Sequence, residues 1–180
     1  MLENLEKQGM YIQTEEVSKE AKKVKNKIFT YNRLHPTKTK KMHKIIEKLF
    51  KKTGEIFFVD RPFQCFLGSN ITIGENFYAN RNLIILDDAE VKFGKNIAIG
   101  PNVGIYTIGH PIDAELRNSK YFISKPITIG DNVWIGGGAT ILQGVTIGNN
   151  VVIGAGSVVT KDIPDNCVAV GTPCKVIKQI

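Results

Sequence analysis

His110 stands out because it is the only histidine after residue 54. It lies between Gly109 and Pro111, and the proline restricts the backbone directly after it. Imidazole exchanges protons close to neutral pH and is the side chain most often used as a general base. His110 is therefore a candidate general base.

A metal centre is the alternative use of a histidine. A three-imidazole zinc site needs further histidines nearby, but His35 and His43 both lie before residue 54. The cysteines are odd in number and form no Cys-x-x-Cys pair, which predicts reduced thiols in or near the core: Cys65, Cys167 and Cys174. We therefore expect neither a metal nor a disulfide.

The length and composition are those of one domain with a small appendage. The chain has 180 residues, of which 42% are hydrophobic. No apolar run approaches the roughly 18–20 residues that cross a bilayer, and no apolar signal-peptide core follows Met1. These features predict a cytoplasmic protein that does not bind a membrane.

The sequence changes character at Gly54. Residues 1–54 contain fourteen Lys and Arg against six Asp and Glu, whereas residues 55–180 contain ten against eleven. The basic segment has helical spacing but few aromatic residues and no recognition motif, so it does not indicate nucleic-acid binding. We predict an N-terminal helical segment, 1–54, and a second region, 55–180. The first helix is expected from Glu15 to about Tyr31 with Thr14 as its cap, and the second from Thr37 to Gly54.

The second region is a repeat of six residues. From Ile129 the aliphatic positions recur without a slip at 129, 135, 141, 147, 153 and 159, and Gly often follows. A six-residue period suits a short strand and a tight turn, so that three units make one triangular coil. The pairs Asp131-Asn132 and Asn149-Asn150 stand where turns with positive φ are expected. The pattern predicts a mainly β fold, a parallel β-helix.

Two departures from the period mark functional positions. Ile85 and Phe93 are eight residues apart, so two extra residues fall around Asp87-Asp88. Ile105 and Ile129 are 24 residues apart without a clean repeat between them, which predicts an excursion at about 106–126 with His110 at its mouth. A loop that the solenoid does not need for its own stability indicates function.

The chain resembles the maltose and galactoside O-acetyltransferases, which are hexapeptide-repeat enzymes. The resemblance covers essentially the whole chain and rests on YAN at 78–80, IGHPID at 108–113 and the block from Lys125 to Pro164. It implies the left hand of the β-helix, which runs against the usual right-handed crossover. It also implies transfer of an acetyl group from acetyl-CoA to a sugar hydroxyl, with His110 as the base and without an acyl-enzyme.

The same resemblance assigns the other site residues. Asn80 and Asp88 match the positions that contact the acceptor. Trp134 matches an indole near the active-site groove, and the backbone N–H of Gly137 matches an oxyanion donor. The positions implied for acetyl-CoA are, in addition to Trp134 and Gly137, Ala155, Thr160, Lys161, Lys175 and Lys178. The family assembles as homotrimers with each site between two subunits, and we expect the same here.

The sequence departs from the family where the acceptor binds. Phe66 replaces a usually polar residue that touches the sugar, and the segment around Gly9-Met10-Tyr11 lacks the usual acidic residue. Both changes predict a more apolar acceptor. Two other functions stay open: O-acetylation of a drug-like compound, as in the chloramphenicol and streptogramin acetyltransferases, which lack the N-terminal helical segment, and a β-helix scaffold without catalysis.

Overall fold

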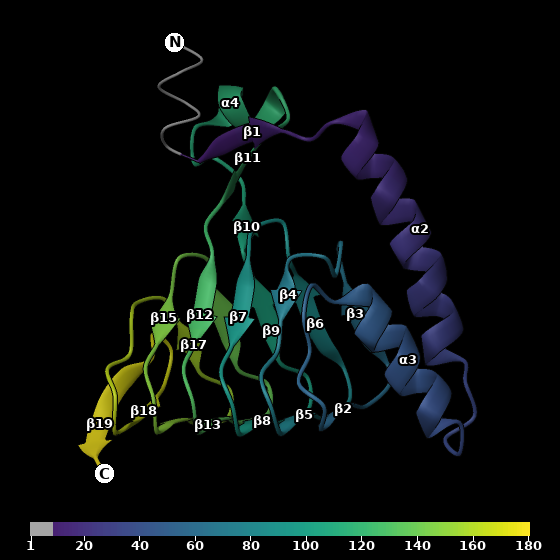
Figure 1. Cartoon of the computed structure of the whole chain (residues 1–180). Helices are drawn as coiled ribbons and strands as arrows, with labels where there is room; N and C mark the ends of the chain where they lie inside the picture. The colour runs from purple at the N-terminus through teal and green to yellow at the C-terminus, as the bar shows by residue number, and fades with distance from the viewer. Residues whose placement is uncertain (1–8) are drawn as a thin grey trace.

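Short strands wound into coils make up most of the protein after residue 56 (Figure 1). The structure is a computed structural model and describes residues 9–180. Two helices precede the coils: α2 (Glu15–Asn32) and α3 (Thr39–Leu49). No helix among residues 9–180 is both long enough and apolar enough to span a bilayer.

The coils form a triangular prism with three parallel faces, as the six-residue period predicts. Face 1 contains β2 (Phe57–Val59), β5 (Phe77–Ala79), β8 (Ile97–Ile99), β13 (Val133–Ile135), β16 (Val151–Ile153) and β18 (Cys167–Val170). Face 2 contains β3 (Phe63–Cys65), β6 (Leu83–Leu86), β9 (Gly104–Tyr106), β14 (Thr140–Leu142) and β17 (Val158–Val159). Face 3 contains β4 (Ile71–Thr72), β7 (Val91–Phe93), β12 (Ile127–Ile129) and β15 (Thr146–Ile147). We call the edge between faces 1 and 2 corner 1, and the edge between faces 2 and 3 corner 2.

The repeat places one aliphatic side chain per unit inside the prism. Each of the six positions from Ile129 to Val159 that the period singles out is at most 1% exposed. Ile135 pairs with Ile99 on one side and Ile153 on the other, so like side chains stack along the axis. Burial of each such side chain contributes about 1.5–3 kcal/mol.

Asparagine makes the turns, as predicted for Asn132 and Asn150. Both have positive φ, at 58° and 54°. Asn96 donates from Nδ2 to Oδ1 of Asn132 at 2.9 Å, and Asn150 donates in the same way to Asn166 at 2.9 Å. Asparagine tolerates the left-handed conformation, and its side chain links one coil to the next.

Corner 2 is where the coils differ in length. We counted residues from the last inward position of face 2 to the equivalent position of face 3, across corner 2. This spacing is eight residues in the first two coils, from 65 to 73 and from 85 to 93. It is 24 residues in the third coil, from 105 to 129, and six in the fourth, from 141 to 147. The coil that begins at Phe57 was not recognised in the sequence. Like the second coil, it contains two extra residues at corner 2, and these interrupt the six-residue period. All extra chain therefore gathers along one edge.

The excursion is a small folded unit. It leaves the prism at Thr107 and returns at Lys125, whose N–H donates to the Thr107 carbonyl at 2.9 Å. Between them lie β10 (Ile108–Gly109), α4 (Ala114–Asn118) and β11 (Tyr121–Ser124). β11 pairs antiparallel with β10 and with β1 (Met10–Ile12), so the N-terminal strand completes a sheet above the prism (Figure 1).

The N-terminal helices lie against the first coil. Thr14 caps α2 as predicted, accepting from the Val17 N–H at 3.4 Å. The predicted bounds of the second helix were wrong. It begins at Thr39, and it ends at Leu49 because Phe50 is extended and the Lys51 N–H joins the prism through the Ile71 carbonyl at 2.9 Å.

The C-terminal strand lies at the far end of the prism together with Cys167 and Cys174, whereas Cys65 lies in the first coil. β19 (Lys175–Gln179) turns back antiparallel onto β18. The thiols are free: Cys65 is half-buried, and Cys167 and Cys174 are buried.

Candidate active site

Corner 2 contains a column of buried polar groups. Asp87 and Thr107 are both fully buried. One oxygen of Asp87 accepts from the N–H groups of Phe66 and Leu67, each at 2.9 Å, and the Thr107 hydroxyl donates to the Leu86 carbonyl at 2.7 Å. These bonds tie the extra residues of three successive coils together, so the corner is a built site rather than a loose loop.

Asp88 points to the N-terminal strand. The Tyr11 hydroxyl on β1 donates to Oδ1 of Asp88 at 2.9 Å. Below it, the Asn70 amide donates to the Asp87 carbonyl at 2.8 Å. The aspartate is half-buried, held between the prism and the small sheet above it.

Aromatic rings connect His110 to this aspartate. The His110 ring lies against Phe122 of β11 with 4.9 Å between ring centroids, and Phe122 lies 5.9 Å from Tyr11. Tyr11 in turn binds Asp88. The structure therefore brings two predicted site residues, His110 and Asp88, into one contact chain. His110 itself is exposed.

Gln143 lies directly beside Gly109, the last residue of β10, which immediately precedes His110. A Cβ atom built on Gly109 would lie 2.8 Å from its Nε2 atom. Its Oε1 atom is buried without a hydrogen-bond partner among the described residues. A buried acceptor of this kind is uncommon in a folded protein.

Burial shifts the ionisation of the carboxylates. It raises the pKa of Asp87 from 3.8 to about 6, although backbone hydrogen bonds from Leu67 and Phe66 oppose the change. Burial also raises the pKa of Asp88, against the lowering effect of the Tyr11 hydrogen bond. The pKa of Tyr11 rises through burial and the neighbouring Asp88 charge, so Tyr11 keeps its proton and remains a donor.

Asn80 and Gly137 lie at corner 1, not at corner 2. Asn80 follows β5, and its Oδ1 accepts from the Arg81 N–H at 2.8 Å. Gly137 and Ala155 occupy the same corner after β13 and β16, and a Cβ on Gly136 would lie 2.5 Å from the Ala155 nitrogen. Within one chain, Asn80 and His110 therefore lie at different corners. The sequence did not reveal this separation, because the repeat pattern alone does not say at which corner of the prism a residue lies.

The remaining predicted positions are spread along the prism. Trp134 points outward from face 1 and is 57% exposed. Thr160 and Lys161 follow β17 at corner 2, and Lys175 and Lys178 lie exposed on β19. Phe66 is half-buried, and its backbone binds Asp87. Thus Phe66, Thr160 and Lys161 share the His110 corner, whereas Trp134 and the last two lysines lie on face 1.

Comparison with known proteins agrees with this architecture. Residues 126–161 match the family model described as bacterial transferase hexapeptide (six repeats). Galactoside O-acetyltransferase of Escherichia coli (strain K12) is 48% identical over 156 residues, covering 87% of this chain and 77% of that protein. The chain belongs to the hexapeptide-repeat acetyltransferases.

Solved structures of the acetyltransferase family superpose on nearly the whole chain. A maltose O-acetyltransferase from Clostridium difficile 630 has a TM-score of 0.94 at 49% identity, covering 95% of this chain and 92% of that one. A galactoside acetyltransferase in complex with coenzyme A also has a TM-score of 0.94, at 45% identity, covering 100% and 90%. The left-handed β-helix predicted from the resemblance is therefore the fold of this acetyltransferase, and the scaffold alternative loses its basis.

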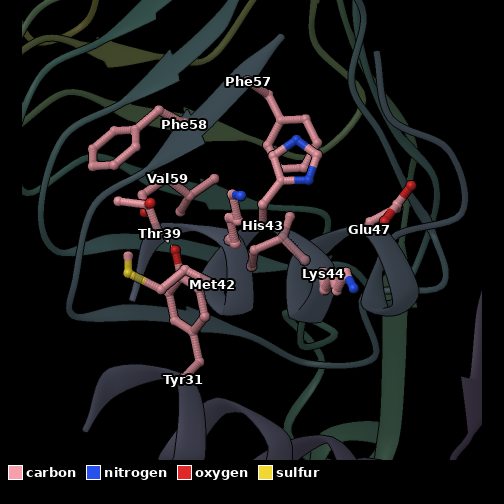
Figure 2. Close-up of a pocket in the computed structure, with 11 residues that line it drawn as sticks. Tyr31, Thr39, Met42, His43, Lys44, Glu47, Phe57, Phe58 and Val59 are labelled. Atoms are coloured by element: carbon pink, nitrogen blue, oxygen red, sulfur yellow. Dashed lines mark hydrogen bonds between the residues drawn. The ribbon is translucent and has the colours of Figure 1, made fainter. Parts of the chain in front are cut away.

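A separate cavity of about 450 Å³ lies between α3 and β2 (Figure 2). His43 there stacks on Phe57 with 3.9 Å between ring centroids, and its Nε2 lies 3.3 Å from the Glu55 carbonyl oxygen. These contacts give His43 a packing role. Within residues 9–180, no three histidine, cysteine or acidic side chains converge as metal ligands.

Three residues that contact Asp88, His110 or Gly109 were not singled out as site candidates in the sequence: Tyr11, Phe122 and Gln143. Tyr11 reaches the site through pairing with Phe122, more than 100 residues away, which no local pattern signals. Gln143 follows a regular repeat unit and has no distinguishing neighbour. Only Tyr11 had a signal, since the segment around it departs from the family pattern.

Proposed function

We propose that this acetyltransferase moves the acetyl group of acetyl-CoA to a hydroxyl of a sugar or glycoside, with His110 as general base. The observation that carries the proposal is the exposed His110 imidazole, which is joined to the half-buried Asp88 through Phe122 and Tyr11. The names of the relatives support a sugar acceptor, since they are galactoside and maltose acetyltransferases.

The transfer needs no covalent enzyme intermediate. His110 removes the hydroxyl proton as the acceptor oxygen attacks the thioester carbonyl carbon, and the resulting oxyanion binds an N–H such as that of Gly137. The C–S bond then breaks, and the proton passes from the imidazolium to the leaving CoA thiolate. Burial raises the pKa of the Cys65 thiol, which argues against a thiolate nucleophile there.

Acetyl-CoA is proposed to lie along the coils. The glycine and alanine positions Gly137 and Ala155 leave the backbone open to the pantetheine arm, with Trp134 alongside on face 1. Thr160 and the exposed Lys161, Lys175 and Lys178 are proposed to meet the nucleotide end. The related galactoside acetyltransferase has been solved in complex with coenzyme A, which supports acetyl-CoA as the co-substrate.

A homotrimer would complete the site. Asn80 and Gly137 lie at corner 1, whereas His110 and Asp88 lie at corner 2, so each site needs two corners from different chains. Exposed apolar groups support such packing: Tyr78 on face 1 is 44% exposed, and Ile112 beside His110 is 98% exposed. We propose that corner 2 of one chain meets face 1 and corner 1 of its neighbour.

Release of CoA from acetyl-CoA tests the activity directly. A thiol reagent would follow it with mono- and disaccharides, aryl glycosides and chloramphenicol as acceptors. We expect turnover with a glycoside and a loss of roughly 100-fold or more in His110→Ala. The matched control is His43→Ala, which removes a histidine from the separate cavity. Turnover with chloramphenicol alone would favour a xenobiotic acceptor, and undiminished turnover in His110→Ala would remove the base assignment.

A further inference from the structure

We propose that the groove between α2 and α3 binds a short phosphate chain, either as free polyphosphate or as the phosphate tail of a nucleotide. The groove lies on the N-terminal helices rather than at a corner of the prism. The proposal is therefore independent of the acetyl transfer, and it gives the basic N-terminal segment a ligand.

The groove has a volume of about 300 Å³ and carries positive charge on both walls. Ile45 is half-buried and, with the methylene groups of the lysines, forms an apolar floor. No acidic residue is among the six residues that line the groove: Lys27 and Thr30 of α2, and Lys41, Lys44, Ile45 and Lys48 of α3. The polar groups that a ligand meets are therefore mainly ammonium groups.

The lysines of the groove have no counter-charge in the described chain. None of the ion pairs found within residues 9–180 involves one of them. Elsewhere on α2, by contrast, Lys19 pairs with Glu15 at 3.5 Å. Lys23 pairs with Glu20 at 2.9 Å. The one acidic residue of α3, Glu47, lines the separate cavity shown in Figure 2.

The spacing of the lysines on α3 makes this lack of partners unfavourable. Lys41, Lys44 and Lys48 follow one another at intervals of three and four residues, which places them on the same side of the helix. Like charges at this spacing repel one another and destabilise a helix. Lys27 adds a fourth positive charge from the opposite wall. An anion bound in the groove would relieve the repulsion among all four lysines at once.

The size and chemistry of the groove favour a small ligand with several negative charges. A volume of about 300 Å³ is at the lower end of the range for ligand sites, which suits a compact anion better than a segment of another protein. Lysine binds phosphate as a point charge, without the planar geometry that arginine offers a carboxylate. The Thr30 hydroxyl already donates to the Asn26 carbonyl at 3.0 Å, so recognition depends on charge. Four lysines in one groove therefore match a chain of phosphates better than a single phosphate.

Thermal unfolding and titration calorimetry with sodium tripolyphosphate test the site. At fixed ionic strength, we expect tripolyphosphate at ten times its Kd to raise the Tm by about 3–6 °C, and orthophosphate at the same concentration to raise it by less than about 1 °C. Lys41→Gln/Lys48→Gln should weaken the Kd by about ten-fold or more. Without ligand, the same variant should unfold at a slightly higher temperature than the wild type, because it removes like-charge repulsion.

The matched control is Lys19→Gln/Lys23→Gln, which changes the net charge by the same amount through the paired lysines of α2. Its Kd for tripolyphosphate should stay within about two-fold of the wild type, because exposed charges farther from the ligand are screened by salt. Equal weakening in the two double variants would reduce the effect to general charge attraction and overturn the groove as a site.

Two further comparisons identify the ligand and its place. Equal Kd values for ATP and tripolyphosphate would indicate that the phosphate chain alone is recognised, whereas tighter binding of ATP would indicate a nucleotide. Lys175→Gln/Lys178→Gln should leave the Kd unchanged, and loss of binding there would place the anion on β19 and overturn the proposal. Stabilisation by orthophosphate as large as that by tripolyphosphate, or by adenosine as large as that by ATP, would overturn it as well.

Discussion

Gly109 leaves little space between the backbone beside His110 and the amide of Gln143. A Cβ added there would lie 2.8 Å from Gln143 Nε2, closer than real Cβ contacts. Because the contact is with the mobile end of a side chain, Gly109→Ala should displace the Gln143 amide, and we expect kcat to fall by about two- to three-fold. Steady-state kinetics of the double variant Gly109→Ala/Gln143→Ala provide the check, since removing the obstructing amide should return part of the activity. A double variant as poor as the single one would show that Gln143 is not the obstacle.

Asp87 should make the stability depend on pH. Its folded pKa of about 6 exceeds the usual 3.8, so folding favours the protonated form. The group therefore lowers stability above about pH 6, and that cost disappears as the pH falls toward 4. A shift of this size corresponds to roughly 3 kcal/mol. We expect the unfolding free energy of Asp87→Asn, measured in urea, to lack this gain between pH 7 and pH 4. Parallel pH profiles for the two proteins would contradict the assignment.

At the scale of elements, the asparagine turns should be sensitive to side-chain type. Asn132 has a φ of 58° and accepts from Asn96 at 2.9 Å. Asn132→Ala loses the bond and forces alanine into the left-handed region, at a cost of about 1–2 kcal/mol for the conformation. Asn132→Gly loses only the bond and should be less destabilised. Thermal unfolding of both variants measures the difference, and equal destabilisation would mean that the bond alone matters.

The elements also show what the sequence could reveal. The unbroken period from Ile129 to Val159 predicted the coils, because each unit needs one inward aliphatic residue and one turn. The slip at Asp87-Asp88 and the long gap after Ile105 both lie at corner 2, since extra chain cannot fit into a regular coil. The coil beginning at Phe57 and the sheet joining β1 to β11 were missed. Two extra residues interrupt the period in the coil that begins at Phe57. The sheet that joins β1 to β11 depends on pairing between segments far apart in the sequence.

At the scale of the whole molecule, the division of the site between two corners makes a shared site testable. Neither Asn80→Ala nor His110→Ala alone should be active, but mixed trimers can combine an intact His110 from one chain with an intact Asn80 from its neighbour. With random assembly, about half of the sites receive an intact His110 and about half receive an intact Asn80, so about one quarter receive both. The co-expressed variants should therefore recover about one quarter of the wild-type kcat.

Light scattering on the same sample would establish whether the particle is a trimer. The control mixes each variant with itself, and it should stay inactive. If co-expression restores nothing while the sample is trimeric, His110 and Asn80 do not meet between chains. The acceptor would then have to bind within corner 2 alone, beside Asp88, Tyr11 and Phe122.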